Sequence, residues 1–282
     1  MEFHKYHALG NDYLVYDPER LPFDLDAQRI ERVCHRNFGL GSDGILLGPL
    51  PSNQARFRLR IFNPDASEAE KSGNGIRIFC RFLFDTGRVS EGESFTLETL
   101  GGLVSAEVHD KGQRIKVSMG RAEFKAGRIP VKTADPESEV IRMPIEVDDN
   151  TWEFCAVSVG NPHCVIPLDT ISAELAKRIG SSVEHHPMFP NRINMQLLKV
   201  IDRSNIQIEI WERGAGYTLA SGTSSCACAV IARKLGLCDR DITVHMPGGT
   251  LSIQVEDDYS LTMTGPTTRV GHYVLHPECL KA

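Results

Sequence analysis

Ser72-Gly73-Asn74-Gly75-Ile76-Arg77 is the stretch that decides the fold of this chain, and Ser221-Gly222-Thr223-Ser224-Ser225-Cys226 is a second version of it. Each places a small hydroxyl residue and a glycine at the start of a helical pattern. Such a helix start exposes backbone N–H groups and the positive end of the helix dipole, which together favour an anion. Gly87 and Gly236 stand where the two helices are expected to end.

The two halves of the chain share five landmarks in the same order, at a nearly constant offset. Gly10-Asn11-Asp12 recurs as Gly160-Asn161-Pro162, 150 positions later, and Arg29-Ile30 recurs as Arg178-Ile179. Two alternating stretches, 57–63 and 206–212, align at an offset of 149 and predict half-buried strands. The two serine-glycine stretches follow, and then a Gly-Gly turn in each half. This order predicts gene duplication and two equivalent domains, rather than a set of merely similar turns.

Length and composition fit a two-domain globular protein. The chain has 282 residues, of which 41% are hydrophobic and 24% charged. A formal charge of −6 and the lack of a basic cluster argue against a nucleic-acid partner. No apolar run approaches the roughly eighteen residues of a membrane span. Because the N-terminus also lacks the pattern of a signal peptide, we expect a cytoplasmic protein with no membrane partner.

Cysteine spacing argues against a metal site. The eight cysteines are scattered and include no CxxC pair. Cys226 and Cys228 lie two positions apart on one predicted helix, so their side chains should point in different directions. We therefore expect most of the cysteines to be buried, reduced thiols.

Between the landmarks the pattern predicts mostly strands. Residues 25–36 have the pattern of an amphipathic helix, and residues 121–149 are expected to join the halves through irregular strands. The last strand-like run, 261–274, is expected to return to the first domain. Further expected features are a strand-turn-strand at 3–16, a glycine-rich loop at 39–44, a strand at 45–47, a polar connection at 63–71, and a meander at 95–119.

Eight motifs resemble those of the diaminopimelate epimerase family and of the related PLP-independent amino-acid racemases and epimerases. They are His7-Ala-Leu-Gly-Asn11-Asp12, Gly39-Leu-Gly-Ser-Asp-Gly44, Phe62-Asn63-Pro-Asp-Ala-Ser-Glu68-Ala-Glu, Gly73-Asn74-Gly75-Ile-Arg77, Gly160-Asn161-Pro162-His163, Arg192-Ile-Asn194, Glu212-Arg213-Gly-Ala-Gly216 and Gly222-Thr223. The resemblance covers nearly the whole chain. It implies an α/β fold of two pseudo-symmetric domains, each a barrel-like, mostly antiparallel sheet around a central helix. We place the N-terminal lobe at 1–118 plus about 265–282 and the C-terminal lobe at 119–264.

The resemblance also implies an isomerase that inverts the α-carbon of diaminopimelate or a similar amino acid. One acid/base group from each domain serves one face of that carbon, and the helix N-termini stabilise the charge that develops. No cofactor is implied, and the expected partners are the small amino-acid substrate and a second copy of the chain, in lysine biosynthesis. By the same resemblance, the substrate-binding positions are Asn11, Asn63, Gly73, Asn74, Asn161, His163, Asn194, Glu212, Arg213, Gly222 and Thr223. Of these, Asn63, Asn161, Asn194 and Arg213 are expected to hold the amino-acid end that does not react.

The chain departs from the family at the residues expected to be catalytic. The family has cysteines directly before Gly-Asn-Gly and Gly-Thr, where this chain has Ser72 and Ser221, and it usually has glutamate at Tyr217. A serine hydroxyl ionises far less readily than a thiol and needs an activating neighbour, for which Tyr217 and His163 are candidates. Cys80 lies roughly 12 Å along its helix from Ser72, too far to substitute. Both serines are also expected to cap their helices.

Three functions remain open from the sequence. The chain is an amino-acid epimerase in which hydroxyls replace thiols, a ligand-binding paralogue without turnover, or an isomerase that uses a single base. Deliberate replacement of both cysteines would give the same serines but would leave Tyr217 unexplained, which favours natural divergence.

Overall fold

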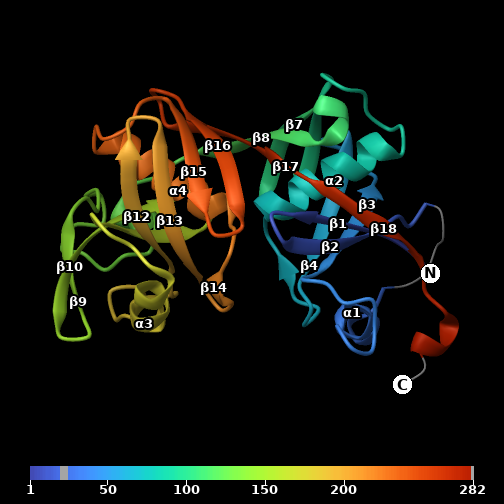
Figure 1. Ribbon diagram of the computed structural model, residues 1–282, viewed down its shortest axis with the longest axis horizontal. Coiled ribbons are helices and arrows are strands. Elements are labelled where there is room, and N and C mark those ends of the chain that lie inside the picture. The colour runs from blue at the N-terminus through green and yellow to red at the C-terminus, as the bar shows by residue number, and fades with distance from the viewer. Residues whose placement is uncertain (20–24, 281–282) are drawn as a thin grey trace. The chain divides into compact units, whose positions relative to one another are not determined.

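The computed structural model describes residues 1–19 and 25–280 and divides the chain into two compact units (Figure 1). Unit 1 comprises Met1–Ser118 and Thr264–Ala282, and unit 2 comprises Met119–Met263. Residues 281 and 282, which end the expected N-terminal lobe, lie outside the described residues. The chain passes from unit 1 to unit 2 within β8 (Arg114–Arg121) and returns within β17 (Ser260–Pro266).

Unit 1 is a mostly antiparallel sheet with a buried helix. Its strands are β1 (Glu2–Ala8), β2 (Asn11–Tyr16), β3 (Ile45–Leu50), β4 (Phe57–Phe62), β5 (Glu68–Ala69), β6 (Ser94–Thr99), β7 (Gly102–His109), the first part of β8, and β18 (Thr268–Val274). Its helices are α1 (Ala27–Cys34), α2 (Gly73–Asp85), and the 3₁₀ turns η1 (Asp110–Gly112) and η3 (Pro277–Leu280). The sheet runs β18-β1-β2-β3-β4-β6-β7-β8, and only its β2–β3 and β4–β6 pairs are parallel among the described pairings.

Unit 2 has the same arrangement of a mostly antiparallel sheet and a buried helix. Its strands are β9 (Met143–Val147), β10 (Asn150–Ser158), β11 (Pro162–Pro167), β12 (Asn194–Asp202), β13 (Asn205–Glu212), β14 (Gly216–Thr218), β15 (Asp241–Met246) and β16 (Gly249–Val255). Its helices are α3 (Ala173–Glu184), α4 (Gly222–Lys234) and the 3₁₀ turn η2 (Ala126–Arg128). Here β11–β12 and β13–β15 are the parallel pairs, at the places that β2–β3 and β4–β6 hold in unit 1. The shared pattern of parallel pairs supports the predicted duplication, and the mixed α/β, sheet-dominated fold agrees with the expected fold class.

Helices α2 and α4 form the cores of their units. α2 contacts β1, β2 and β7, and α4 contacts strands from β10 to β16. Both are buried on nearly every side, and Gly87 and Gly236, with φ of +72° and +73°, follow their C-terminal ends as predicted. The other two helices, α1 and α3, are amphipathic and cover apolar clusters that include Ile30 and Ile179. In each unit the sheet therefore holds one helix whose N-terminus is fixed by burial.

Local boundaries differ from the expectation in two places. The helix expected at 25–36 is shorter, since Asp26 caps its start and His35 is already extended, with ψ of 124°. The polar connection expected at 63–71 contains β5, which pairs with β4 through Ile61 and Phe62. A two-residue strand carries too little periodicity to be recognised in the sequence.

Candidate active site

The N-terminus of α2 is capped by Ser72. Its Oγ accepts a hydrogen bond from the Gly75 N–H at 3.0 Å, so the serine satisfies one of the free amides of the first turn. The hydroxyl of Tyr13, from β2, lies 3.4 Å from the same Oγ. Gly73 and Asn74 are buried directly behind the cap. The helix start in unit 1 thus places a capping hydroxyl beside a phenol.

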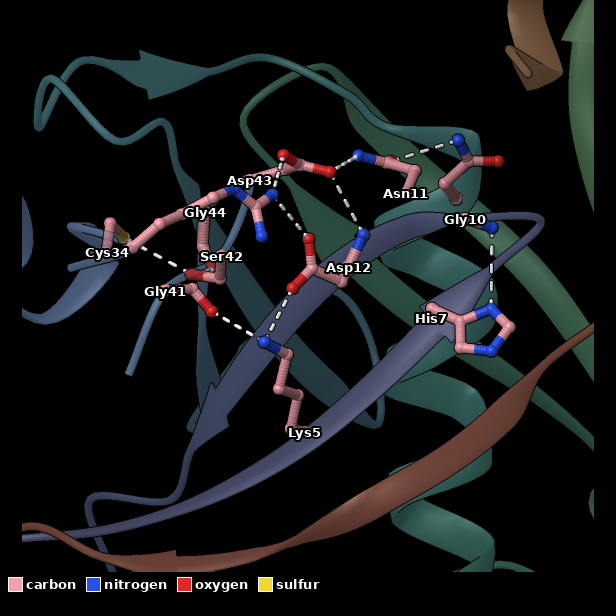
Figure 2. Close-up of polar contacts among 12 residues, drawn as sticks. Lys5, His7, Gly10, Asn11, Asp12, Cys34, Gly41, Ser42, Asp43 and Gly44 are labelled. Atoms are coloured by element: carbon pink, nitrogen blue, oxygen red, sulfur yellow. Dashed lines mark hydrogen bonds and ion pairs between the residues drawn. The ribbon is translucent and has the colours of Figure 1, made fainter. Parts of the chain in front are cut away.

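Two side-chain amides and a carboxylate, from three segments of unit 1, meet beside this cap. Asn74 Nδ2 donates to Asn11 Oδ1 at 3.0 Å, and Asn11 Nδ2 donates to Asp43 Oδ2 at 2.9 Å. Asp43 belongs to the glycine-rich loop before β3, and Figure 2 shows its carboxylate between Asn11 and the neighbouring Asp12. Asn63, at the end of β4, donates instead to Ser67 Oγ at 2.9 Å within its own turn. Unit 1 therefore brings Asn11 and Asn74 together, while Asn63 forms a local bond.

The N-terminus of α4 is capped in the same way by Ser221. Its Oγ accepts from the Ser224 N–H at 3.4 Å and lies 3.4 Å from the Thr223 hydroxyl. Glu212, at the end of β13, lies near Ser221, whose hydroxyl lowers the pKa of that carboxyl. Burial raises the pKa of the Glu212 carboxyl, and the Ser221 hydroxyl opposes that rise only in part. The helix start in unit 2 therefore pairs a hydroxyl with a carboxyl that keeps its proton to a higher pH than usual.

His163 lies at the centre of a buried polar chain in unit 2. Its Nδ1 lies 3.2 Å from Gln196 Oε1, and its Nε2 lies 2.9 Å from Asn161 Oδ1. Gln196 Nε2 donates to Ser224 Oγ at 3.0 Å, which leaves its Oε1 toward the ring. The ring is fully buried, and this burial lowers the pKa of His163 to about 3. His163 is therefore a neutral imidazole that orients Asn161.

Arg213 and Asn194 lie where the loop after β13 approaches β12. Asn194 Oδ1 accepts from the Arg213 N–H at 3.0 Å, and its Nδ2 donates to Pro162 O at 2.8 Å. The Arg213 guanidinium donates to Asn191 O at 3.2 Å and is largely exposed. An exposed guanidinium on a fixed loop suits a carboxylate ligand.

A buried carboxylate at the end of α3 holds that loop in place. Glu184 accepts from Trp211 Nε1 at 2.8 Å and from the Gly214 N–H at 2.9 Å. Its side chain is 4% exposed, and Arg192 lies 3.3 Å from the same carboxylate. Because Trp211 and Gly214 flank Glu212 and Arg213, Glu184 fixes the segment that carries both predicted site residues.

Tyr217 lies on β14 opposite Trp211, one position from the Glu212–Gly216 pair. Its hydroxyl donates to Glu209 Oε2 at 2.6 Å, and burial together with this carboxylate raises the pKa of the phenol. Neighbouring residues on a strand point to opposite faces, so Tyr217 and Glu212 lie on different faces of the hairpin. The described hydrogen bond of Tyr217 is therefore to Glu209, rather than to Ser221.

None of the cysteines lies at either helix start. Cys80 and Cys226 are fully buried along α2 and α4, and burial raises the pKa of the Cys80 thiol. Seven of the eight cysteines are buried and all are free thiols, as expected from their spacing. Within residues 1–19 and 25–280 we find no group of His, Cys, Asp or Glu side chains placed to bind a metal ion.

Sequence reasoning missed the residues that support the predicted ones. Gln196, Glu184 and Asp43 each bind a predicted site residue or the loop that carries one. Glu184 and Gln196 are polar residues in otherwise apolar helical and strand patterns, which is the one signal that could have marked them. Tyr13 could have been found only from its place two residues after Asn11.

Comparison with known proteins identifies the family of the chain. The model of the family described as diaminopimelate epimerase matches residues 3–125 and 155–270. A protein named diaminopimelate epimerase 2 from Nostoc sp. is 56% identical over 278 residues, which cover 99% of this chain and 96% of that protein. A diaminopimelate epimerase from Moorella thermoacetica is 43% identical over 276 residues, covering 96% of this chain and 97% of that protein.

Solved structures share the fold at lower sequence identity. A hydroxyproline epimerase from Agrobacterium vitis has a TM-score of 0.67 and 14% identity, covering 97% of this chain and 90% of that one. A phenazine biosynthesis protein from Bacillus anthracis has a TM-score of 0.67 and 18% identity, covering 98% and 99%. Among the described residues, no helix combines the length and hydrophobicity needed to cross a membrane. The family match spans most of both units, and the chain belongs to the diaminopimelate epimerase family, a family of isomerases.

Proposed function

We propose that this chain is a PLP-independent epimerase that inverts the α-carbon of diaminopimelate or a similar amino acid. The observation that carries the proposal is the nearness of Ser221, at the N-terminus of α4, to the Glu212 carboxyl, whose pKa is raised by burial and lowered in part by that hydroxyl. This pair joins a hydroxyl at an anion-binding helix start to a group that can accept and return a proton. It supplies the activating neighbour that a serine requires for acid/base work.

In the proposed reaction Ser221 and Glu212 act as one proton carrier. As Ser221 Oγ takes the α-proton of the substrate, its own proton passes to the ionised Glu212 carboxylate, so no free alkoxide forms. In the reverse direction the protonated carboxyl returns the proton through the same hydroxyl. The N–H groups of the first turn of α4 stabilise the charge that develops on the substrate carboxylate. Ser72, with Tyr13 beside it, is the proposed second proton carrier.

The substrate is proposed from the family and from the chemistry of the remaining residues. Diaminopimelate carries a second amino-acid end, with a carboxylate and an ammonium at fixed separation. Arg213 offers an exposed guanidinium on a loop held by Asn194, and Asn161 is oriented by His163. A guanidinium and side-chain amides are suited to bind such an end. Asn63 is also proposed to bind this end, and that assignment rests only on the motif in which Asn63 lies.

The difference between the two helix starts favours a second candidate function. Ser221 has a carboxyl partner, whereas the described partner of the Ser72 hydroxyl is a phenol. A phenol gives up its proton far less readily than a carboxyl. An isomerase or exchange catalyst with only the Ser221–Glu212 base would remove and return the proton on one face. Such an enzyme exchanges the α-proton without inverting the carbon.

Incubation with LL-diaminopimelate in D₂O separates these functions. We expect loss of the α-proton signal in NMR spectra together with formation of the meso isomer, and both should fall at least about a hundredfold in Glu212→Gln. Exchange without inversion would favour the one-base isomerase. Binding by calorimetry with no exchange would contradict the proposal and indicate a ligand-binding paralogue.

Hydroxylamine, which traps aldehyde cofactors, should leave the rate of epimerisation unchanged.

Return of both serines to cysteine tests the proposed proton carriers directly. Ser72→Cys with Ser221→Cys should raise the exchange rate by about tenfold or more, because a thiol ionises more readily at a helix N-terminus. It should also lower stability by about 1 kcal/mol per helix, since cysteine caps poorly. Ser172→Cys is the matched control, because Ser172 caps α3 in the same way, by accepting from the Leu175 N–H at 3.2 Å. A double variant with no gain in rate would show that these positions do not carry the proton.

We also propose that the chain works as a homodimer in the cytoplasm, within lysine biosynthesis. The free thiols of all eight cysteines suit a reducing compartment. The place in lysine biosynthesis follows from the substrate in the names of its relatives. Light scattering coupled to size-exclusion chromatography should give twice the mass of one chain, and a mass of 31.3 kDa would contradict the dimer.

A further inference from the structure

A continuous chain of hydrogen bonds in unit 1 begins at a carboxylate and ends at a guanidinium. Asn11 Nδ2 donates to Asp43 Oδ2 at 2.9 Å, and Asn74 Nδ2 donates to Asn11 Oδ1 at 3.0 Å. Arg77 Nη2 then donates to Asn74 Oδ1 at 2.9 Å, from a fully buried side chain. Figure 2 shows the Asp43 end of this chain, with Asn11 turned toward the carboxylate.

The charged groups at the two ends fix the orientation of both amides. A carboxylate only accepts hydrogen bonds and a guanidinium only donates them. Asn11 must therefore turn its NH₂ toward Asp43 and its oxygen toward Asn74, which in turn must place its own oxygen against Arg77. Rotation of either amide by half a turn would bring two acceptors or two donors together. The chemistry of the ends, rather than the local backbone, determines which atom of Asn11 faces which way.

Asp43 is itself held on both oxygens. Oδ1 accepts from Arg36 Nη2 at 2.6 Å, and Oδ2 accepts from the Asp12 N–H at 3.1 Å in addition to Asn11. The first contact is an ion pair across the loop between α1 and β3, and the second reaches the start of β2. Asp43 thus presents Oδ2 to Asn11 in one fixed position.

We propose that Asp43 is a positioning residue, which holds the Asn11 amide so that it offers an N–H donor to a carboxylate oxygen of the amino-acid substrate. The inference rests on the proposed function, since it assigns Asn11 a place against that substrate. One amide hydrogen of Asn11 is used on Asp43, and the second is left to the ligand. A reversed amide would present its oxygen and repel a carboxylate. Asp43 thereby selects for an anionic group without touching it.

Asp12 offers a matched control within the same cluster. It is the sequence neighbour of Asn11, and its carboxylate accepts from the same Arg36 at 2.8 Å and from Lys5 at 2.8 Å. In the hydrogen bonds of the described residues, its side chain contacts neither Asn11 nor Asn74. Asp12→Asn therefore removes a carboxylate charge from the same cluster, at a more buried side chain than Asp43, while leaving the polarity of the amide chain intact.

A double-mutant cycle on substrate binding tests whether Asp43 acts through Asn11. Asn11→Ala and Asp43→Ala should each weaken diaminopimelate binding by about tenfold with little change in kcat, because one charge-linked hydrogen bond is lost. The double variant should bind no more weakly than Asn11→Ala alone, and Asp43→Asn, which keeps an acceptor oxygen, should restore most of the affinity. Independent effects that multiply to about a hundredfold would overturn the proposal. So would equal losses in Asp12→Asn and Asp43→Ala.

Side-chain amide signals of the ligand-free protein test the chain of bonds without any substrate. Asp43→Ala, or Asp43→Asn if the alanine variant does not fold, should move the signals of both Asn11 and Asn74, although Asp43 touches only the first. Asp12→Asn should leave both signals in place. A shift confined to the Asn11 signal would show that the chain of hydrogen bonds does not connect Asp43 with Asn74. If the wild type neither binds nor exchanges diaminopimelate, the proposed function fails, and these signals alone decide whether Asp43 orients Asn11.

Discussion

His163 shows how a buried ring can serve a site by staying neutral. Gln196 Oε1 and Asn161 Oδ1 lie at its two ring nitrogens, 3.2 and 2.9 Å away. The ring can then hold Asn161 in one place without bringing a charge into the core of unit 2. The role of a histidine next to a predicted ligand-binding residue is here one of orientation, and burial is what enforces it.

The protein should become less stable as pH falls, because His163 resists protonation in the folded protein. Its pKa is about 3 when folded and near 6.5 when unfolded, so the unfolded state binds more protons between these values. Stability from this group is fully present above about pH 6.5 and is lost as pH falls toward 3. From pH 7 to pH 5 the free energy of unfolding should drop by about 2 kcal/mol in urea titrations.

His163→Gln provides the control for this pH dependence. The variant lacks the titrating ring, so its drop over the same interval should be smaller by about 2 kcal/mol. Glu212 titrates with the opposite sign, since its pKa is raised on folding, and the difference between the two proteins cancels its contribution. Equal slopes in wild type and variant would show that His163 is not buried in its neutral form.

At the scale of elements, the segment from Trp211 to Gly214 depends on α3. Glu184 ends that helix and accepts from both residues, as described above. Gly180, one turn earlier, lies so close to Trp211 that a Cβ atom there would come within 2.3 Å of the indole. The helix therefore approaches the hairpin at the distance that only glycine permits, and this approach brings the carboxylate to the loop.

Replacement of Glu184 should weaken both the fold and the site. Glu184→Gln keeps the shape of the side chain but removes the ion pair with Arg192. The NH₂ group of the new amide must also face one of the two donors, Trp211 Nε1 or the Gly214 N–H. We expect unit 2 to lose about 2 kcal/mol of stability and diaminopimelate binding to weaken several-fold through Arg213. Glu174→Gln, in the exposed first turn of α3, is the matched control and should change neither. Binding calorimetry beside thermal melts would reveal a purely structural role if only the melting temperature moved.

The sequence predicted elements well where they carry a period or a cap. The starts of α2 and α4 followed from Ser72 and Ser221, and β4 and β13 followed from their alternation. The partners of the site residues did not follow, because a hydrogen bond between residues far apart in sequence leaves no periodic trace. Gln196 lies 33 residues from His163, and Asp43 lies 32 from Asn11. Polarity in a buried strand was the only local mark of such a partner.

At the scale of the whole molecule, duplication accounts for most of what could be foreseen. Repeated landmarks predicted two units, and both units pair their strands in the same order, with the parallel pairs at matched places. The side chains beside the two helix starts differ, since Ser72 lies near Tyr13 whereas Ser221 lies near Glu212. A repeat identifies equivalent positions, but the side chains that reach those positions come from substitutions that each half made separately.

Removal of the last strand should destabilise unit 1 alone. β18 pairs with β1 from Glu2 to His7, and its loss would leave β1 as an open edge. In a chain that ends at Pro266, we expect proteolysis of unit 1 to be at least about tenfold faster, because more of it is open at equilibrium. Cleavage within unit 2 should not change. A chain that ends at His276 keeps β18 and serves as the control, and equal resistance of the two truncated chains would contradict the expectation.

The pairing of β18 with β1 also determines the order in which the two units can fold during translation. β1 is synthesised before unit 2, but its partner strand β18 is synthesised after it. Unit 2 is continuous from Met119 to Met263 and can fold on the nascent polypeptide, while unit 1 stays incomplete until β18 has been translated. The half that is made second is therefore the half that can be finished first, and chaperones that guard nascent chains would meet the open edge of β1.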